Sequence, residues 1–145
     1  NILPLEIQTE LQRLLAINDE VLNKQLITAL NIMFSESEQK VRLNTDFELE
    51  FFINNETLYF PQLSSGERQV IYILLKVAIA TRNNALILMD EPEISLHLSW
   101  QEKLLTQIRK INPNSQIIIV THSPAIVMNG WLDCFVDIQD IIVKG

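Results

Sequence analysis

The residues best suited to chemistry follow two apolar stretches of the chain. Asp90 and Glu91 come directly after the apolar residues 85–89, and His122 follows the apolar residues 117–120. In open α/β sheets, buried parallel strands are apolar throughout and ligands bind beyond their carboxyl ends. One carboxylate there could hold Mg²⁺, its neighbour could accept a proton from water, and a histidine could donate to a phosphoryl group. The pattern therefore indicates the metal and base site of a nucleotide hydrolase.

These three side chains also fit ordinary structural roles. A core strand that ends in solvated acids is common, and a single histidine is more often a capping or core residue than a ligand. His122 follows Thr121 and precedes Ser123-Pro124, at the sheet edge where Asp90 is expected. The neighbouring motifs are needed to decide between the two interpretations.

A small polar segment begins a long apolar helix, expected to run to about residue 80. Ser64 and Ser65 are favoured N-cap residues, Gly66 permits close backbone approach, and Glu67 lies in the first turn. The exposed amide groups at this helix start could face a phosphate. The same residues would also serve simply as a good cap for a core helix.

Periodicity predicts the elements that must position these groups. Residues 1–34 are expected to be helical, with Asn18 as the N-cap of the second helix, and residues 1–40 form a helical subdomain or lid. Phe47, Leu49, Phe51 and Ile53 alternate with Asp46, Glu48 and Glu50, which predicts a hairpin that turns at Asn54-Asn55.

The second half of the chain alternates strands and helices. Residues 85–90 form a strand, a helix capped by Ser99 follows, and residues 116–121 form a second buried strand. A short helix begins at Ser123-Pro124, and residues 135–143 are expected to form edge strands. Because strand, helix and strand follow in order, the fold class predicted is α/β with a parallel sheet.

The composition limits the class of protein. A chain of 145 residues with 48% hydrophobic and 20% charged residues is expected to fold as one domain. Its formal net charge of -7 disfavours an extended nucleic-acid surface. The single cysteine, Cys134, is interpreted as a small buried hydrophobe in a reducing compartment. With no membrane span or signal peptide evident, a cytoplasmic location is expected. Because the chain starts at Asn1 in an interior-like sequence, we expect it to be a piece of a longer protein.

Four segments together resemble the motifs of ATP-binding-cassette (ABC) ATPases. Residues 63–69, Leu-Ser-Ser-Gly-Glu-Arg-Gln, resemble the signature motif, and residues 88–91 resemble the end of the Walker B strand. Residues 95–97 resemble the D-loop, and His122 resembles the switch histidine. The order and spacing match over about residues 57–130, which makes the combination much more specific than any one motif.

The resemblance implies a P-loop NTPase-like core, ATP and Mg²⁺ as cofactors, and a role for each residue. Two such domains sandwich two nucleotides in this family, so the catalytic unit would be a homodimer. Asp90 would anchor magnesium, Glu91 would be the general base and His122 would sense the γ-phosphate. The remaining motif residues would act across the dimer interface: Ser64, Ser65, Gly66 and Glu67 on the γ-phosphate held by the opposite subunit, and Ser95, Leu96 and His97 as the crossing D-loop.

Details of the motifs favour soluble ATPases over transporters. Transporters usually carry Gln at the position of Glu67 and a Ser-Ala-Leu-Asp type D-loop, where this chain has Ile94-Ser95-Leu96-His97. The motifs are more similar to those of bacterial overcoming-lysogenisation-defect and related AAA-type ATPases. That resemblance implies a role in DNA maintenance or anti-phage defence, with a nuclease or nucleic acid as a partner.

The chain departs from the family in one large respect. No Gly-x-x-x-x-Gly-Lys-Ser/Thr phosphate loop occurs, and the only glycines are Gly66, Gly130 and Gly145. Residues 41–145 are therefore expected to be the carboxyl-terminal part of an ATPase domain whose Walker A half lies elsewhere. The chain alone should bind ATP weakly and hydrolyse it little. Two alternatives stay open: a non-catalytic dimerisation or regulatory module, and the nucleotide-binding subunit of a transporter.

Overall fold

Four helices lie between two small sheets in the computed structural model, which describes residues 2, 4–46 and 48–143. The helices are α1 (Pro4–Ile17), α2 (Glu20–Met33), α3 (Ser65–Ala80) and α4 (Leu98–Ile111). The strands are β1 (Lys40–Leu43), β2 (Leu49–Ile53), β3 (Glu56–Leu58), β4 (Ile87–Asp90) and β5 (Ile117–Val120). Single 3₁₀ turns are η1 (Ser35–Ser37), η2 (Phe60–Gln62), η3 (Pro124–Val127), η4 (Leu132–Cys134) and η5 (Ile138–Asp140).

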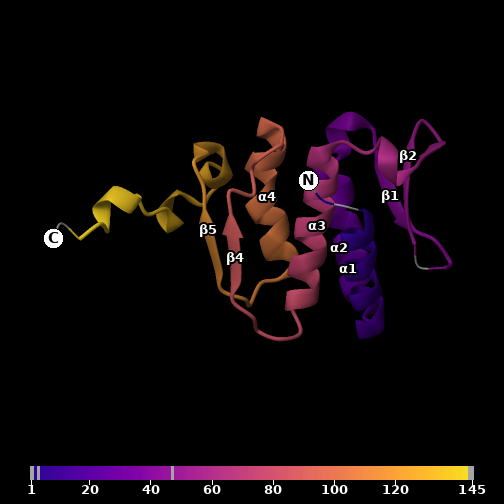
Figure 1. The fold of residues 1–145 in the computed structure, drawn as a ribbon, viewed down its shortest axis with the longest axis horizontal. Helices are drawn as coiled ribbons and strands as arrows, with labels where there is room; N and C mark the ends of the chain where they lie inside the picture. Colours follow the sequence, from indigo (N-terminus) through magenta and orange to yellow (C-terminus); the bar gives the residue numbers. More distant parts are fainter. Residues whose placement is uncertain (1, 3, 47, 144–145) are drawn as a thin grey trace.

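The hydrophobic core is formed where α2, α3 and α4 pack on one another (Figure 1). Apolar side chains of these helices recur at three- and four-residue spacing, which places them on one face. Each fully buried Leu or Ile stabilises the fold by about 1.5–3 kcal/mol. The fully buried residues of this core include Leu26, Leu30, Met33, Ile71, Leu74, Leu104 and Ile108.

Among the described residues, no helix is both long and apolar enough to cross a bilayer.

The second helix begins one residue later than predicted. Asp19, not Asn18, is its N-cap, and the Asp19 carboxylate accepts a hydrogen bond of 3.1 Å from the Leu22 amide. Asn18 adopts a positive φ of 53° instead. Asparagine tolerates this left-handed conformation, so Asn18 makes the turn that separates α1 from α2.

The predicted hairpin forms and gains a third strand. Asn54 and Asn55 have φ values of 51° and 66°, as a type I′ turn between β2 and β3 requires. The strand β1 pairs antiparallel with the other edge of β2, which gives the order β1-β2-β3. Phe47, which the alternation placed at the start of this strand, lies outside the described residues.

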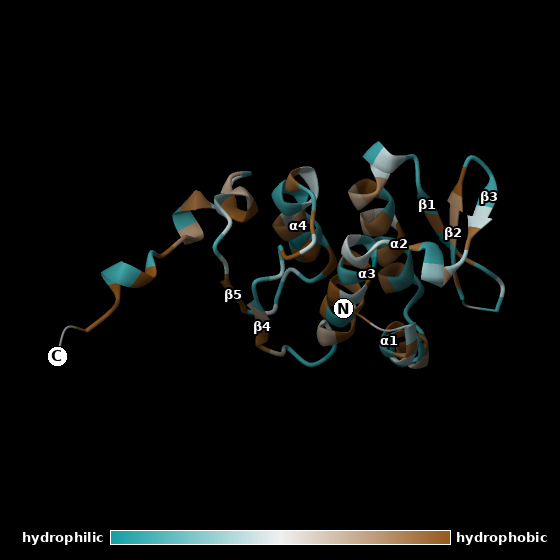
Figure 2. Ribbon diagram, turned by 45° about the horizontal axis from the view of Figure 1, so that its top comes forward, coloured by the Kyte–Doolittle hydropathy of each residue, from teal (hydrophilic) through white to brown (hydrophobic). Residues whose placement is uncertain are grey.

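The predicted parallel pair also forms, but it is not buried on both faces. Strands β4 and β5 align Ile87 with Ile117 and Asp90 with Val120. One face packs against the helices, whereas on the other face Leu88 is 68% exposed and Val120 is 53% exposed. The prediction of fully buried strands was wrong because helices cover only one side of this two-stranded sheet (Figure 2).

The carboxyl-terminal segment corrects two further predictions. Residues 135–143 form no edge strand; they contain only the turn η5 and extend away from the helices (Figure 1). The short apolar runs in this segment lie beside no described strand that could pair with them, so their side chains remain exposed. Cys134, expected to be buried, is exposed for the same reason.

The end of α4 is fixed by a buried polar network. Asn112 is 1% exposed and its Nδ2 donates to the Val77 carbonyl at 3.2 Å and to Ser115 Oγ at 3.0 Å. Its Oδ1 accepts the Ser115 amide at 3.1 Å. One side chain thus joins α3 to the turn that leads into β5.

We expect Asn112→Ala to lower the free energy of unfolding by about 1–3 kcal/mol, since it leaves buried backbone groups without partners. Urea denaturation followed by circular dichroism measures this. The matched control is Asn83→Ala in the exposed turn after α3, which should change stability little. Equal denaturation midpoints for the two variants would contradict the structural role of Asn112.

Candidate functional site

The carboxyl ends of β4 and β5 form one edge, at the same end of the molecule as the start of α3 (Figure 1). Beyond the last residue pair, the Glu91 amide donates to the Val120 carbonyl at 2.7 Å. Glu91 then turns the chain with a left-handed φ of 48°. A non-glycine, non-asparagine residue in this conformation costs about 1–3 kcal/mol, and such residues cluster at functional sites as well as in tight turns. The turn separates the directions of the Asp90 and Glu91 side chains.

The predicted base and the predicted switch histidine are in direct contact. Glu91 Oε1 lies 3.0 Å from His122 Nε2, and the His122 side chain is exposed at the surface. The two atoms lie within ion-pair distance, and the pair carries opposite charges only when the imidazole is protonated. The arrangement orients a carboxylate that can accept a proton from a nearby water.

Asp90 lies at the same edge on the uncovered face of the sheet. Its side chain is exposed and makes no hydrogen bond or ion pair with the other residues that the structure describes. A free carboxylate is a suitable ligand for Mg²⁺, which commonly takes one or two carboxylates and keeps several waters. No group of three or more acidic, histidine or cysteine side chains among the described residues could hold a metal together. The residues present thus fit a hydrated cation held by one carboxylate.

Glu93 belongs to this edge, although the sequence analysis assigned it no role. Its Oε1 accepts hydrogen bonds from Thr121 Oγ1 at 2.6 Å and from the His122 amide at 3.0 Å. The carboxylate therefore fixes the backbone that carries His122. The sequence does contain a feature that could have indicated this role. In Asp-Glu-Pro-Glu, a second carboxylate follows Glu91 by two residues, close enough along the chain to reach the neighbouring strand.

Gln101 is a second residue that the sequence analysis missed. Its Nε2 donates to the Leu96 carbonyl at 3.0 Å, and its Oε1 accepts a hydrogen bond from Ser123 Oγ. The loop before α4 and the loop after β5 are therefore joined through one side chain. No local pattern marks this role, because both partners lie on loops whose positions only the fold defines.

The start of α3 is capped as the sequence predicts. Ser64 Oγ accepts the Glu67 amide at 3.1 Å, and Glu67 Oε1 accepts the Ser64 amide at 3.4 Å. This is a capping box, so both residues serve the ordinary structural role. Ser64 and Ser65 are nevertheless exposed, which leaves the helix start open to a ligand.

Gly66 brings the signature-like segment against the D-loop-like segment. It is buried, and a Cβ there would collide with the Ser95 carbonyl oxygen and lie 3.2 Å from Trp100 Cζ3. Ser95 itself has a left-handed φ of 70°. The His97 ring contacts Trp100 edge-on at 4.8 Å between centroids. Leu96, grouped with Ser95 and His97 by the resemblance, is buried in its own core rather than available to cross an interface.

The predicted cap of α4 was wrong. The helix begins at Leu98 with His97 as its N-cap residue, and no side chain caps it. Ser99 instead hydrogen-bonds the Glu36 carboxylate, which lowers the pKa of Glu36 together with Lys103, whose ammonium lies 3.2 Å away. The Ser99 hydroxyl therefore links the start of α4 to η1 by donating to a charged carboxylate there.

Comparison with known proteins adds to this geometry. The chain is 35% identical over 94 residues to the Septu protein PtuA of Bacillus thuringiensis, a match that covers 56% of this chain and 24% of that protein. It is 36% identical over 103 residues to the DNA double-strand break repair Rad50 ATPase of Methanocaldococcus jannaschii, covering 64% of this chain and 10% of that protein. The chain thus spans a quarter or less of the length of these relatives.

The fold is similar to that of a protein of known structure. The crystal structure of the SmcHead bound to the C-winged helix domain of ScpA aligns with a TM-score of 0.60 and 18% sequence identity, covering 76% of this chain and 36% of that one. This likeness fits a P-loop NTPase-like core. The model of one family, described as "AAA domain, putative AbiEii toxin, Type IV TA system", matches residues 5–129. The chain therefore belongs to this family of AAA domains and is an ABC/AAA-type ATPase domain fragment.

Proposed function

We propose that residues 41–145 form the carboxyl-terminal part of an ABC-type ATPase head, in which ATP binding closes a homodimer and hydrolysis reopens it. The observation that carries this proposal is the 3.0 Å contact between Glu91 and His122 at the shared end of β4 and β5. A strained backbone, a carboxylate and an imidazole meet there, at the strand ends where α/β sheets bind ligands.

Each group at this edge has a proposed task. Glu91 accepts the proton of the attacking water, and His122 orients Glu91 and meets the terminal phosphate. Asp90 holds the nucleotide's magnesium ion directly or through water, and the ion would neutralise phosphate charge when bound. Glu93 and Gln101 act as positioning residues because they fix the loop that carries His122.

The start of α3 is proposed to serve the partner subunit's nucleotide. In this proposal Ser64 and Ser65 offer exposed hydroxyls, and Gly66 and Glu67 complete the first turn of the helix, whose positive end suits a phosphate. Ser95 and His97 are proposed to cross the same interface. Since Gly66 packs directly on the Ser95 carbonyl, a shift of one segment would be transmitted to the other.

The domain is proposed to be completed by an amino-terminal half that carries a Walker A phosphate loop. No such loop occurs in this chain. The uncovered apolar face of the parallel pair, with Leu88, Ile118 and Val120, supports this proposal because a further layer of the domain packed against it would bury these side chains. Residues 1–40 are proposed to act as a helical subdomain or lid beside this head.

The setting proposed is DNA maintenance or anti-phage defence in the cytoplasm, with a nuclease or nucleic-acid partner and no membrane partner. A relative named as a DNA double-strand break repair ATPase supports the first part. The resemblance of the motif set to soluble bacterial ATPases supports the second. With a net charge of -7, this part of the protein is expected to act through nucleotide and protein contacts.

Glu91→Gln tests the proposed base in the intact protein that includes the phosphate loop. We expect the ATP turnover rate to fall by about 100-fold or more, because an amide cannot accept the proton. A coupled phosphate-release assay measures the rate. Glu56→Gln, the same change at an exposed position of the β2–β3 hairpin, is the control and should leave it unaltered. An unchanged rate in Glu91→Gln would eliminate the enzymatic proposal.

A second prediction concerns the chain by itself. Isothermal titration calorimetry with Mg-ATP should show no tight binding to the 145-residue chain, because the lysine and amide cradle for the β- and γ-phosphates is missing. A Kd in the micromolar range would contradict this expectation. The intact protein, measured under the same conditions, is the positive control.

A further inference from the structure

Trp100, in the first turn of α4, lies between the signature-like and the D-loop-like segments. It is 4% exposed and belongs to the core, whereas Ser95 and His97 are exposed at the surface. Its Cζ3 atom lies 3.2 Å from the position that a Cβ on Gly66 would occupy. Its ring also contacts the His97 ring edge-on, with 4.8 Å between centroids and 75° between planes. The indole therefore contacts both segments that are proposed to face the partner subunit.

Gln101, the next residue of α4, holds the D-loop-like segment from another side. Its Nε2 donates to the Leu96 carbonyl at 3.0 Å, and its Oε1 accepts a hydrogen bond from Ser123 Oγ. Consecutive residues of an α-helix point about 100° apart, so Trp100 can pack on the start of α3 while Gln101 reaches the loop after β5. Two neighbouring side chains thus fix residues 95–97 between the other two motif segments.

The end of α2 supports the indole. Phe34, the C-cap residue of α2, is 0% exposed, and its ring meets the Trp100 ring with 5.4 Å between centroids and 65° between planes. Edge-to-face contacts with centroids about 4.5–7 Å apart are favoured by the quadrupoles of aromatic rings. Such a contact depends on the angle between the rings as well as on their distance. Phe34 therefore restricts the orientation of the indole.

A polar contact holds the same turn of α4 to the corner after α2. The Glu36 carboxylate in η1 accepts hydrogen bonds from the Ser99 side chain and from the Lys103 ammonium, the latter at 3.2 Å. Ser99 and Lys103 are four residues apart, so they lie on one face of α4. The first turn of α4 is therefore held to this corner by charge-assisted hydrogen bonds as well as by the ring contact.

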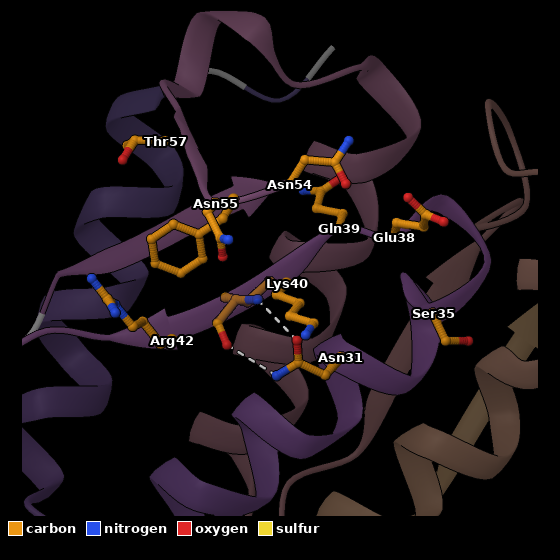
Figure 3. Close-up of a pocket in the computed structure, with 11 residues that line it drawn as sticks. Asn31, Ser35, Glu38, Gln39, Lys40, Arg42, Asn54, Asn55 and Thr57 are labelled. Atoms are coloured by element: carbon orange, nitrogen blue, oxygen red, sulfur yellow. Dashed lines mark hydrogen bonds between the residues drawn. The ribbon is translucent and has the colours of Figure 1, made fainter.

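The last turn of α2 is also joined to the antiparallel sheet. Asn31 Oδ1 accepts the Val41 amide at 2.9 Å, and Asn31 Nδ2 donates to the Val41 carbonyl at 2.9 Å (Figure 3). Asn31 and Phe34 are three residues apart on this helix end, so one turn contacts β1 through Asn31 and α4 through Phe34. A displacement of α2 would therefore reach the indole.

We propose that Trp100 is a positioning residue of the nucleotide site. It sets the spacing between the start of α3 and the D-loop-like segment, and Phe34 couples that spacing to residues 1–40. This inference rests on the proposed function, in which both segments act on the partner subunit's nucleotide. Trp100 is buried and acts on the nucleotide only through Gly66 and His97. Removing the indole would leave a cavity beside Gly66, into which the surrounding segments would shift.

Hydrogen exchange of the nucleotide-free intact protein tests the positioning independently of catalysis. The amides of Arg68 and Leu96 donate to backbone carbonyls at the start of α3 and in the D-loop-like turn. In Trp100→Leu, peptides that contain them should exchange at least about tenfold faster, relative to peptides of α1. Phe34→Leu keeps the indole but removes its support, so it should change exchange in the same direction by about threefold.

The matched control for the loss of a buried aromatic ring is Phe51→Leu. Phe51 lies in β2 and is 4% exposed, as Trp100 is. This variant should leave the exchange ratios of both segments unaltered. Ratios in Trp100→Leu equal to those of the unmodified protein would overturn the positioning role. So would an equal rise in Phe51→Leu, because the effect would then be one of general destabilisation.

ATP turnover of the intact protein tests the consequence for the site. In Trp100→Leu we expect kcat to fall about tenfold while the KM for Mg-ATP stays within about twofold, since the phosphate loop that holds the nucleotide is unchanged. Trp100→Phe keeps a ring and should recover most of kcat, and Phe51→Leu should retain both parameters.

The Glu91→Gln variant separates failure of this inference from failure of the proposed function. A normal kcat in Trp100→Leu beside a large loss in Glu91→Gln would refute the positioning role alone. Normal rates in both variants would refute the proposed function. The exchange ratios would still decide whether Trp100 holds the two segments together.

Discussion

The candidate nucleotide site depends on how the parallel ladder ends. The Glu91 amide extends the pairing of β4 and β5 by one hydrogen bond to the Val120 carbonyl. This bond fixes the point at which the two chains separate, and the left-handed turn at Glu91 follows from it. Without that register, the Glu91 carboxylate and the His122 imidazole would not face each other across 3.0 Å. The side chains of Glu93 and Gln101 then hold the loops around them by hydrogen bonds. The site therefore depends on one backbone hydrogen bond and on the hydrogen bonds of two side chains.

Much of this could be predicted from the sequence, because each feature is local or periodic. The heptad-like spacing in α2 and α3, the Asn54-Asn55 turn and the capping box at Ser64 all depend on residues a few positions apart. The convergence of Asp90, Glu91 and His122 at one edge followed from the rule that parallel strands end together. Such rules need no knowledge of what surrounds each element.

The predictions that were wrong depend on surroundings. The apolar sequence of β4 suggests burial on both faces, yet only one face has helices against it. Residues 135–143 have the composition of edge strands but lie beside no strand with which to pair. Ser99 is a residue type that often caps helices, but its hydroxyl hydrogen-bonds Glu36, which is distant in sequence, instead of capping α4.

The uncovered face of the parallel pair has a consequence for the solubility of the chain. A sheet with two open edges and a row of exposed aliphatic side chains is the geometry from which aggregates grow. The helices α2, α3 and α4 bury their apolar faces on one another within this chain. The strands gain protection only when another surface reaches them. Among the described residues, the exposed apolar side chains most open to aggregation therefore lie on β4, β5 and the segment that follows them, not in the helical core.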